Sequence, residues 1–335
     1  MNLFIGYSSA LEYWRNRPAY DDIASQPVCR VTSLRGCAIS IKEVKMAAPE
    51  WHGFPYGEDM PLDILVPQGN KRRRSLQLKP HVQTDALPIG SFYHVAHGVY
   101  VSSPELVYLQ MSKSLELEEL VLLGYELCGL YSRCSATDSD TASFTQRMLV
   151  LSSKTRIFNY LRRCGLNSKS KAMRALQWVV ERCASPAESV VAAMLCLPQN
   201  RGGYGYMLPL ANQKLFVGQR LSSYVKGNYY YPDLLWERVR KGSKIKVGVE
   251  YDSHQEHDEP TRAEATRIRR NDLKTLGILV TSINRSQLRN AEAFDLAARQ
   301  IGRDLGLRRP EAGISDMAHK DFLLRKLMLC DQKGQ

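Results

Sequence analysis

The chain has 335 residues, of which 46 are Lys or Arg and 34 are Asp or Glu, giving a formal net charge of +12. This length predicts about two domains, and a content of 44% hydrophobic and 24% charged residues excludes a wholly disordered chain. No apolar run approaches the roughly 20 residues of a membrane-spanning helix, so we expect no membrane partner. The basic excess favours an anionic partner such as nucleic acid, although a surface that meets another protein also explains it.

The amino-terminal segment and the cysteines indicate the compartment. The sequence Met-Asn-Leu-Phe-Ile lacks the charged segment and long apolar stretch of a secretory signal. The 8 cysteines include no Cys-x-x-Cys pair, and no histidine lies at zinc-finger spacing from a cysteine pair. Small buried side chains in a reducing compartment explain them best, so we expect a cytoplasmic protein.

Residues 1–150 alternate short strand-like and helical segments, which predicts a mixed α+β domain of undefined role. The expected elements, in chain order, are strands at 64–67 and 92–101 and helices at 102–111 and 117–131. A basic run follows the first strand and is assigned to nucleic-acid binding: Lys71, Arg72, Arg73 and Arg74. The segment 132–143 is rich in Ser, Thr and Asp, which predicts a loop near the domain boundary.

Two basic helices are expected next, over 153–163 and 168–183, and together they form a helical connector at 151–184. Gly165 ends the first of them. A solvated face and a surface that docks on phosphates both explain the many cations of this connector.

The remaining chain predicts a second domain at 185–310, followed by a carboxy-terminal helix within 311–335. Its expected elements are a helix at 185–197, strands at 215–217, 228–236 and 244–252, a helix at 261–276, a strand at 278–283 and a helix at 286–305. The element order is therefore α-β-β-β-α-β, and the whole chain is expected to be an α/β protein, α+β overall.

Acidic side chains lie where this order brings two strands together. Glu250 and Asp252 project from one face of the third strand, because strand side chains alternate with a period of two. Asp233 follows Pro232 on the second strand, and a hairpin between the two strands places Asp233 beside Glu250. Glu188, one turn into the preceding helix, completes the group. Clustered carboxylates repel one another without a cation, so the pattern predicts a site for Mg²⁺ or Mn²⁺.

Each acidic residue also has a simpler explanation. Ser185 and Glu188 have the spacing of a helix capping box. Asp233 suits a turn, and a solvent-facing strand accounts for Glu250 and Asp252. The order and spacing of the whole set favour the metal site over these separate explanations.

Histidines and basic residues follow the third strand. His254 and His257 come directly after it, and a histidine beside a metal site can act as a general base or orient water. Arg267, Arg270 and Lys274 recur at i, i+3 and i+7 on one face of the next expected helix, where they can hold backbone phosphates.

Pro232-Asp233 followed by Glu250-Tyr251-Asp252, on this element order, resembles the PD-(D/E)XK nuclease superfamily. The closer likeness is to its branch related to very-short-patch-repair endonucleases, which includes a bacterial domain with a Glu-x-Asp-Gly…His motif. Here the motif extends to His257, and Arg270-Asn271 also match. The likeness covers about residues 183–307. The preceding region is weakly similar to amino-terminal parts of proteins related to bacterial abortive-infection antitoxins.

The resemblance implies a restriction-endonuclease-like core over 185–310. It also implies metal ligands and catalytic residues, which are Glu188, Asp233 and Glu250 for the metal and Asp233, Glu250, Asp252 and His257 for catalysis. Two positions depart from the family pattern. Asp252 stands where the superfamily has a lysine, and Ser253 replaces the usual glycine. Lys246, four residues before Glu250 on the same strand face, is the candidate replacement cation.

We therefore expect a deoxyribonuclease that depends on Mg²⁺ or Mn²⁺ and acts on DNA in phage defence or DNA repair. The alternative is a catalytically inactive protein of the same fold, which serves as a DNA-binding regulator or as an antitoxin-like partner in a defence or toxin–antitoxin system. From residue 261 to the end, 15 Lys and Arg outnumber 9 Asp and Glu, which favours a nucleic acid on the carboxy-terminal domain.

Overall fold

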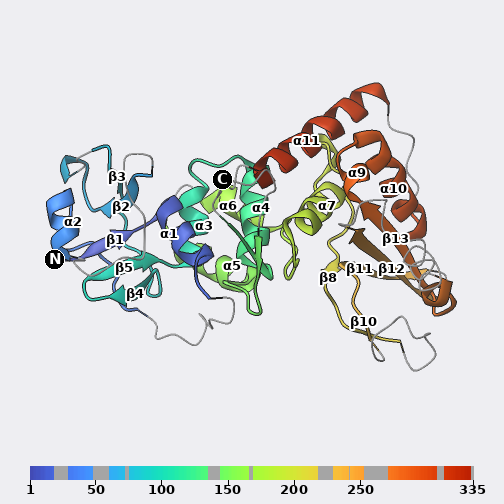
Figure 1. The fold of residues 1–335 in the computed structure, drawn as a ribbon, viewed down its shortest axis with the longest axis horizontal. Helices are drawn as coiled ribbons and strands as arrows, with labels where there is room; N and C mark the ends of the chain where they lie inside the picture. Colours follow the sequence, from blue (N-terminus) through green and yellow to red (C-terminus); the bar gives the residue numbers. More distant parts are fainter. Residues whose placement is uncertain are drawn as a thin grey trace. The chain divides into compact units, whose positions relative to one another are not determined.

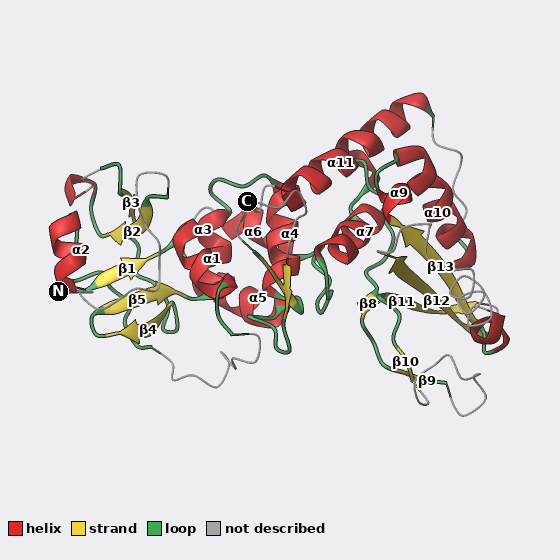
Figure 2. Cartoon of the chain, viewed as in Figure 1, coloured by secondary structure: helices red, strands yellow, loops and turns green. Residues whose placement is uncertain are grey.

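The computed structural model describes residues 1–18, 29–47, 60–71, 75–134, 144–165, 169–217, 229–240, 242–252, 271–307 and 313–332. Over these residues the chain combines helices with several β-sheets (Figure 1) (Figure 2). It divides into two compact units. The first comprises residues 1–128, 132–139 and 145–177, and the second comprises residues 129–131, 140–144 and 178–335.

The first unit is built on a five-stranded mixed sheet with the strand order β3-β2-β1-β5-β4. Its strands are β1 (Leu3–Ile5), β2 (Leu62–Val66), β3 (Leu78–Val82), β4 (Phe92–Ala96) and β5 (Val99–Ser102). The central strand β1 is antiparallel to β2 and parallel to β5. The outer pairs are β2 parallel to β3 and β4 antiparallel to β5. The strand expected at 64–67 is thus present as β2.

The segment expected as one strand at 92–101 is instead the hairpin β4–β5. Gly98 lies in the turn with a φ of +69°, a conformation that favours glycine. A Cβ at this position would lie 2.9 Å from the carbonyl oxygen of Met1. Both arms of the hairpin are rich in β-favouring residues, so composition alone conceals the turn.

The first unit also contains helices, two of which contact this sheet. The helices are α1 (Tyr7–Arg15), α2 (Ile41–Ala47), α3 (Pro104–Met111), α4 (Leu117–Leu127), α5 (Lys154–Arg163), α6 (Lys169–Leu176) and the short 3₁₀ helix η2 (Gly69–Lys71). The expected start of α3 is confirmed, because Ser103 Oγ accepts a hydrogen bond from the Leu106 N–H at 3.2 Å with Pro104 in the first turn.

The helix expected at 117–131 ends earlier than predicted. After α4 the chain turns back, and the Arg133 N–H donates to Glu126 Oε1 at 3.1 Å. The segment that follows α4 forms strand β6 (Tyr131–Arg133), which pairs with β7 (Phe144–Gln146). The hydrogen bond to a buried carboxylate thus ends the helix four residues before the expected position.

The basic helices expected as a connector belong to the first unit. On α5, Tyr160 is buried and its hydroxyl forms a hydrogen bond with Ser91 Oγ at 2.8 Å. Arg156 of the same helix forms an ion pair with Glu105 at 3.0 Å. The following helix, α6, ends at Leu176 rather than at the expected 183. The connector predicted at 151–184 is therefore divided at residue 177, because its first part packs on α3 and α4.

A buried ion pair joins α1 to α4. Arg15 donates from Nε and Nη2 to the two oxygens of the fully buried Glu126, each at 2.8 Å. Arg15 Nη1 also donates to Glu12 at 2.6 Å. Burial opposes ionisation of Glu126, but Arg15 outweighs it and holds the pKa of Glu126 below its usual value. Charge as well as apolar packing thus attaches α1 to the unit.

The second unit contains a four-stranded mixed sheet with the order β13-β12-β11-β8. Its strands are β8 (Leu210–Ala211), β11 (Leu234–Arg240), β12 (Ser243–Asp252) and β13 (Ile278–Asn284). Neighbouring pairs β8–β11 and β11–β12 are antiparallel, and β12–β13 is parallel. A separate two-stranded ribbon consists of β9 (Leu215–Phe216) and β10 (Tyr229–Tyr230).

Helices cover one face of this sheet. The helices of the second unit are α7 (Pro186–Cys196), α9 (Arg285–Leu288), α10 (Ala291–Asp304), α11 (Ile314–Gln332) and the 3₁₀ helix η3 (Gln199–Arg201). Of these, α7, α9 and α10 contact the strands, and α11 packs on α7 and α10. Residues 271–275 are also helical, and Leu273 packs on the opposite face. Both α7 and α10 contact β12. Alternation along the strands directs the buried Trp236, Val247 and Val249 to the face that the helices cover. Lys320 of α11 forms an ion pair with the buried Asp295 of α10 at 2.7 Å.

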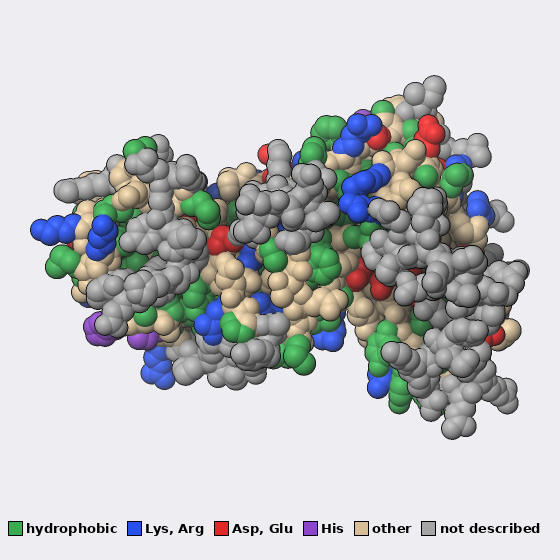
Figure 3. Space-filling view, viewed as in Figure 1, with side chains coloured by type: hydrophobic (Ala, Val, Ile, Leu, Met, Phe, Trp, Pro, Cys, Tyr) green, Lys and Arg blue, Asp and Glu red, His purple; other side chains and the backbone are tan. Residues whose placement is uncertain are grey.

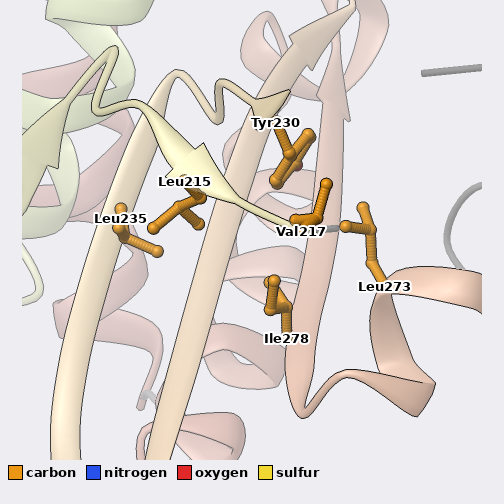
Figure 4. Packing of buried hydrophobic residues seen from close by; sticks show 6 residues of the cluster. All are labelled: Leu215, Val217, Tyr230, Leu235, Leu273 and Ile278. Atoms are coloured by element: carbon orange, nitrogen blue, oxygen red, sulfur yellow. The ribbon is translucent and has the colours of Figure 1, made fainter. Parts of the chain in front are cut away.

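The ribbon covers the opposite face of the sheet, and the two meet in an apolar cluster. Figure 4 shows its residues, which are Leu215, Val217, Tyr230, Leu235, Leu273 and Ile278. The cluster explains two differences from the expected strands. The segment 215–217 pairs within the ribbon, and β8 is the first strand of the sheet. The strand expected at 228–236 is divided into β10 and β11 around Pro232, which has no N–H to donate.

Three expected helices remain. The predicted helix at 286–305 is two helices, because Asn290 Oδ1 accepts from the N–H groups of Glu292 and Ala293 at 3.0 Å and starts α10 anew. The last helix is confirmed as α11. Most of the helix expected at 261–276 lies outside the described residues, which include only its end at 271–275.

Candidate functional site

The register between β11 and β12 brings two of the expected carboxylates together. Leu234 pairs with Val249 in this antiparallel hairpin, so the next step of the register places Asp233 opposite Glu250. The expected hairpin is confirmed. Directly opposed residues of antiparallel strands have Cβ atoms about 4.5–5.5 Å apart, close enough for both side chains to reach one ligand.

Each of these two carboxylates is oriented by a nearby donor. The Tyr251 backbone N–H donates to Asp233 Oδ2 at 2.6 Å, across the hairpin. The Tyr230 hydroxyl donates to Glu250 Oε1 at 2.9 Å, from the ribbon. A carboxylate has about four acceptor positions, so it can accept such a hydrogen bond and bind a cation as well. The arrangement positions two carboxyl groups at one end of the hairpin.

Glu188 lies in the first turn of α7, three residues after the N-cap residue Ser185. Its carboxylate accepts from the Ala184 N–H at 2.8 Å and from the Ser185 hydroxyl at 3.0 Å. The Glu188 N–H in turn donates to Ser185 Oγ at 3.2 Å. Asn212 Nδ2 donates to Glu188 Oε2 at 3.1 Å. Burial raises the pKa of Glu188, and these hydrogen bonds to its carboxylate act in the opposite direction.

Asn212 links Glu188 to Asp233. Its backbone N–H donates to the Asp233 carbonyl oxygen at 3.0 Å, while its side chain binds Glu188. Asn212 has a φ of +49°, which asparagine tolerates better than most residues. Burial raises the pKa of the Cys183 thiol, and the charges of Glu188 and Asp233 raise it further. Glu188 thus connects to Asp233 through Asn212.

The other two candidates of β12 lie on the same face as Glu250. Asp252 is exposed and pairs in register with Asn284 of β13. Lys246 is four residues before Glu250, roughly 13 Å along the strand. It forms an ion pair with Glu237 on β11 at 3.2 Å. The structure therefore does not bring Lys246 next to the carboxylates.

The remaining candidates fall into two groups. Lys274 is exposed at the end of the helical segment before β13, and Lys71 is exposed in η2 of the first unit. The others lie outside the described residues, and these are Arg72, Arg73, Arg74, His254, His257, Arg267 and Arg270.

The oxygen donors of this site can be compared with the ligands that a divalent metal ion prefers. Within the described ranges, no group of three or more His, Cys, Asp or Glu side chains is arranged to hold a metal ion. Two opposed carboxylates nevertheless match the preference of Mg²⁺, which binds through one or two carboxylates and completes its shell with water and phosphate. The carboxyl groups of Asp233 and Glu250 therefore fit such an ion, and Glu188 accepts hydrogen bonds from Ala184, Ser185 and Asn212.

Sequence reasoning missed the donors that orient the carboxylates. Tyr230 is the middle residue of Tyr229-Tyr230-Tyr231, directly before Pro232-Asp233. Its place in an expected strand three residues before an acid is the signal that could have identified it, because so short a separation keeps the two residues near each other. Asn212 gives no comparable signal, because its role depends on a backbone conformation that the sequence pattern does not show.

Comparisons with known proteins do not assign the chain to a family. A scan against protein-family models found no match, and searches of curated proteins and of solved structures found no significant match. Within the described residues, no helix is both long enough and apolar enough to cross a membrane.

Proposed function

We propose that the second unit is a metal-dependent endonuclease that hydrolyses phosphodiester bonds of DNA. The observation that carries the proposal is the pairing of Leu234 with Val249 in the β11–β12 hairpin, which by one further step of the register sets Asp233 opposite Glu250. The sheet that follows α7 supports the proposal. Its β8–β11 and β11–β12 pairs are antiparallel, and its β12–β13 pair is parallel. This is compatible with the α-β-β-β-α-β core that the resemblance to the PD-(D/E)XK superfamily implies.

The residues of the site have distinct roles in this proposal. Asp233 and Glu250 bind Mg²⁺ or Mn²⁺, and the Tyr251 N–H and Tyr230 hydroxyl hold their carboxylates in place. A bound divalent cation supplies a polarised phosphodiester and a water of lowered pKa. Glu188 is assigned a positioning role, because it reaches Asp233 through Asn212. The oxygen of water bonds to phosphorus, and the P–O bond to one nucleoside breaks.

One observation favours a second candidate function, a DNA-binding protein of the same fold without catalysis. Asp252 stands at the position where the superfamily has lysine, and Lys246 pairs with Glu237 away from the carboxylates. Such a protein binds DNA with a strong salt dependence and cleaves none with any divalent ion.

Plasmid cleavage by the purified full chain tests the proposal. With Mg²⁺ or Mn²⁺ we expect supercoiled DNA to be nicked or linearised, and EDTA to stop the reaction. Asp233→Asn and Glu250→Gln retain the shapes of the side chains, and each should reduce the cleavage rate at least about 100-fold, because removal of an electrostatic stabiliser costs that much. Asp321→Asn, an exposed acid paired with Arg325 on α11, is the matched control and should cleave like the wild type.

Two results would contradict the proposal. Cleavage that survives both hairpin substitutions would remove the site from the reaction. Salt-sensitive DNA binding without cleavage under any metal condition would favour the second candidate instead. Melting temperatures of all variants show whether a lost activity reflects a lost fold.

A further inference from the structure

The ribbon β9–β10 has two chemically different faces. Its register pairs Tyr229 with Phe216 and Tyr230 with Leu215. Leu215 and Tyr230 are buried, whereas 69% of Phe216 and 39% of Tyr229 are exposed. The paired residues thus alternate between an inner face and an outer face, as the two-residue period of a strand requires.

The inner face attaches the ribbon to the sheet that carries the carboxylates. Leu215, Val217 and Tyr230 pack on Leu235 and Ile278 (Figure 4). The same Tyr230 donates its hydroxyl to Glu250 at 2.9 Å. The ribbon is therefore positioned relative to the hairpin carboxylates by apolar packing and by one hydrogen bond.

The outer face presents aromatic rings with a cation. The rings of Phe216 and Tyr229 meet edge to face, with centroids 5.6 Å apart and planes at 66°. Lys214 Nζ lies 3.7 Å from the centroid of the Tyr229 ring. Tyr231, directly after β10, is 52% exposed. Figure 3 shows hydrophobic side chains beside a basic one over this part of the second unit.

The chemistry of this outer face fits unpaired nucleotides. Every base offers a flat π surface to an aromatic ring, and a neighbouring cation attracts the phosphate backbone. The outer face has both features, in the rings of Phe216, Tyr229 and Tyr231 and in the cation of Lys214. In a duplex the flat surfaces of the bases are covered by their neighbours, so aromatic rings stack readily only on single strands or on bases that have left the stack.

We propose that the ribbon β9–β10 is a stacking platform for single-stranded DNA, through Phe216, Tyr229 and Tyr231 with Lys214 as the phosphate contact. The inference rests on the proposed function, whose substrate class it specifies as unpaired or locally opened DNA. Tyr231 is two residues from Asp233, at most about 7 Å along the backbone. A base stacked there lies within one or two nucleotides of the candidate site.

Binding measured without metal tests the platform separately from cleavage. The full chain in EDTA is titrated into a fluorescent single-stranded oligonucleotide and into its duplex, and anisotropy is recorded. We expect tighter binding of the single strand. Phe216→Ala and Tyr229→Ala should each weaken that binding roughly 5- to 100-fold, because one base–aromatic stack contributes that much. Tyr229→Phe keeps a ring and should bind nearly as the wild type does.

Matched variants separate stacking from charge and from general surface loss. Phe322→Ala removes a ring that is also 69% exposed, on α11, and should leave binding unchanged. Lys214→Gln should lower the slope of log affinity against log salt by about 0.7, the value for one phosphate contact on a single strand. Glu250→Gln keeps an acceptor for the Tyr230 hydroxyl, so it should reduce cleavage at least about 100-fold while retaining the preference for single strands.

The possible results are distinguishable. Ring variants that bind single strands like the wild type overturn the platform, even if Glu250→Gln abolishes cleavage. Ring variants that lose single-strand binding support it, even in a protein that cleaves nothing. If sedimentation instead shows a wild-type dimer that Phe216→Ala and Tyr229→Ala convert to a monomer, with DNA binding unaffected, the face binds a second copy and the proposal is wrong.

Discussion

The buried ion pair between Arg15 and Glu126 allows a quantitative test of what stabilises the first unit. Arg15→Met removes both 2.8 Å hydrogen bonds and leaves a carboxylate that is fully buried without its cation. Breaking a buried pair in this way costs about 3–5 kcal/mol. Replacing both partners in Arg15→Met/Glu126→Gln removes the uncompensated charge and keeps an acceptor for the Arg133 N–H, so the double variant should recover at least about 2 kcal/mol of that loss.

The pH dependence of the pair follows from the pKa of Glu126. Arg15 holds this pKa below its usual value in the folded protein, despite burial. A carboxyl group whose folded pKa is depressed contributes stability that is complete above the unfolded pKa of about 4.3. That contribution is lost as the pH falls through the lower folded pKa. The wild type should therefore lose stability in acid more steeply than the double variant.

Hydrogen exchange read by peptide is the appropriate measurement, because it follows each unit separately. In Arg15→Met, amide protection in α1 and α4 should fall about 100- to 4,000-fold, which corresponds to 3–5 kcal/mol. Peptides of α10 in the second unit serve as the internal control. A fall below about fivefold, or a double variant that loses as much as the two single variants combined, would refute the assignment of stability to this pair.

Two further predictions concern the second unit. Tyr230→Phe retains the ring in the apolar cluster but removes the hydroxyl bound to Glu250. The cleavage rate should therefore fall roughly 10-fold, the equivalent of about 1.4 kcal/mol. Tyr231→Phe, at an exposed ring, is the control, and equal rates of the two variants would show that the Tyr230 hydroxyl does not position Glu250. Gly202→Ala introduces a Cβ 2.4 Å from the His319 carbonyl oxygen at a φ of +86°, and should release α11 at a cost of about 2–4 kcal/mol, detected by limited proteolysis. Gly277→Ala, with a φ of +75° but nothing within 4 Å, controls for backbone strain alone and should be cut no faster than about the wild type.

The parts of the fold that were predictable are those with a local signal. The alternation of β12 predicted its faces, and with the preceding acid it predicted the opposition of Asp233 and Glu250. The Ser185-Pro-Ala-Glu188 sequence predicted the start of α7, where Ser185 Oγ accepts from the Glu188 N–H as the N-cap residue. These features depend on periodicity and on contacts within four residues, which the sequence displays directly.

The parts that were not predictable depend on contacts between distant residues. In the sequence, the two strands of the ribbon cannot be distinguished from strands of the main sheet. Only their packing with Leu273, which is distant in the chain, shows that the ribbon covers one face of that sheet. The helices α5 and α6 look like a connector because their cations are visible in the sequence, whereas the partners of Tyr160 are far along the chain. The pairing of Lys246 with Glu237 likewise follows from the register, since the two residues are distant in sequence and adjacent only across the hairpin.

The placement of α1 and β1 also has a consequence for synthesis. β1 is the central strand of its sheet, and it can pair with β5 only after β5 has been synthesised. Arg147, later still in the chain, donates to the carbonyl oxygen of Trp14 at 3.5 Å. At about 5–20 residues per second, the ribosome needs roughly 5–19 s to progress from Arg15 to Met111, the end of α3, on which α1 packs. During that interval the apolar side of α1, including the buried Trp14, lacks the surface that α3 and β5 complete. Nascent chains of this protein should therefore depend on chaperones that shield α1 until α3 has left the ribosome.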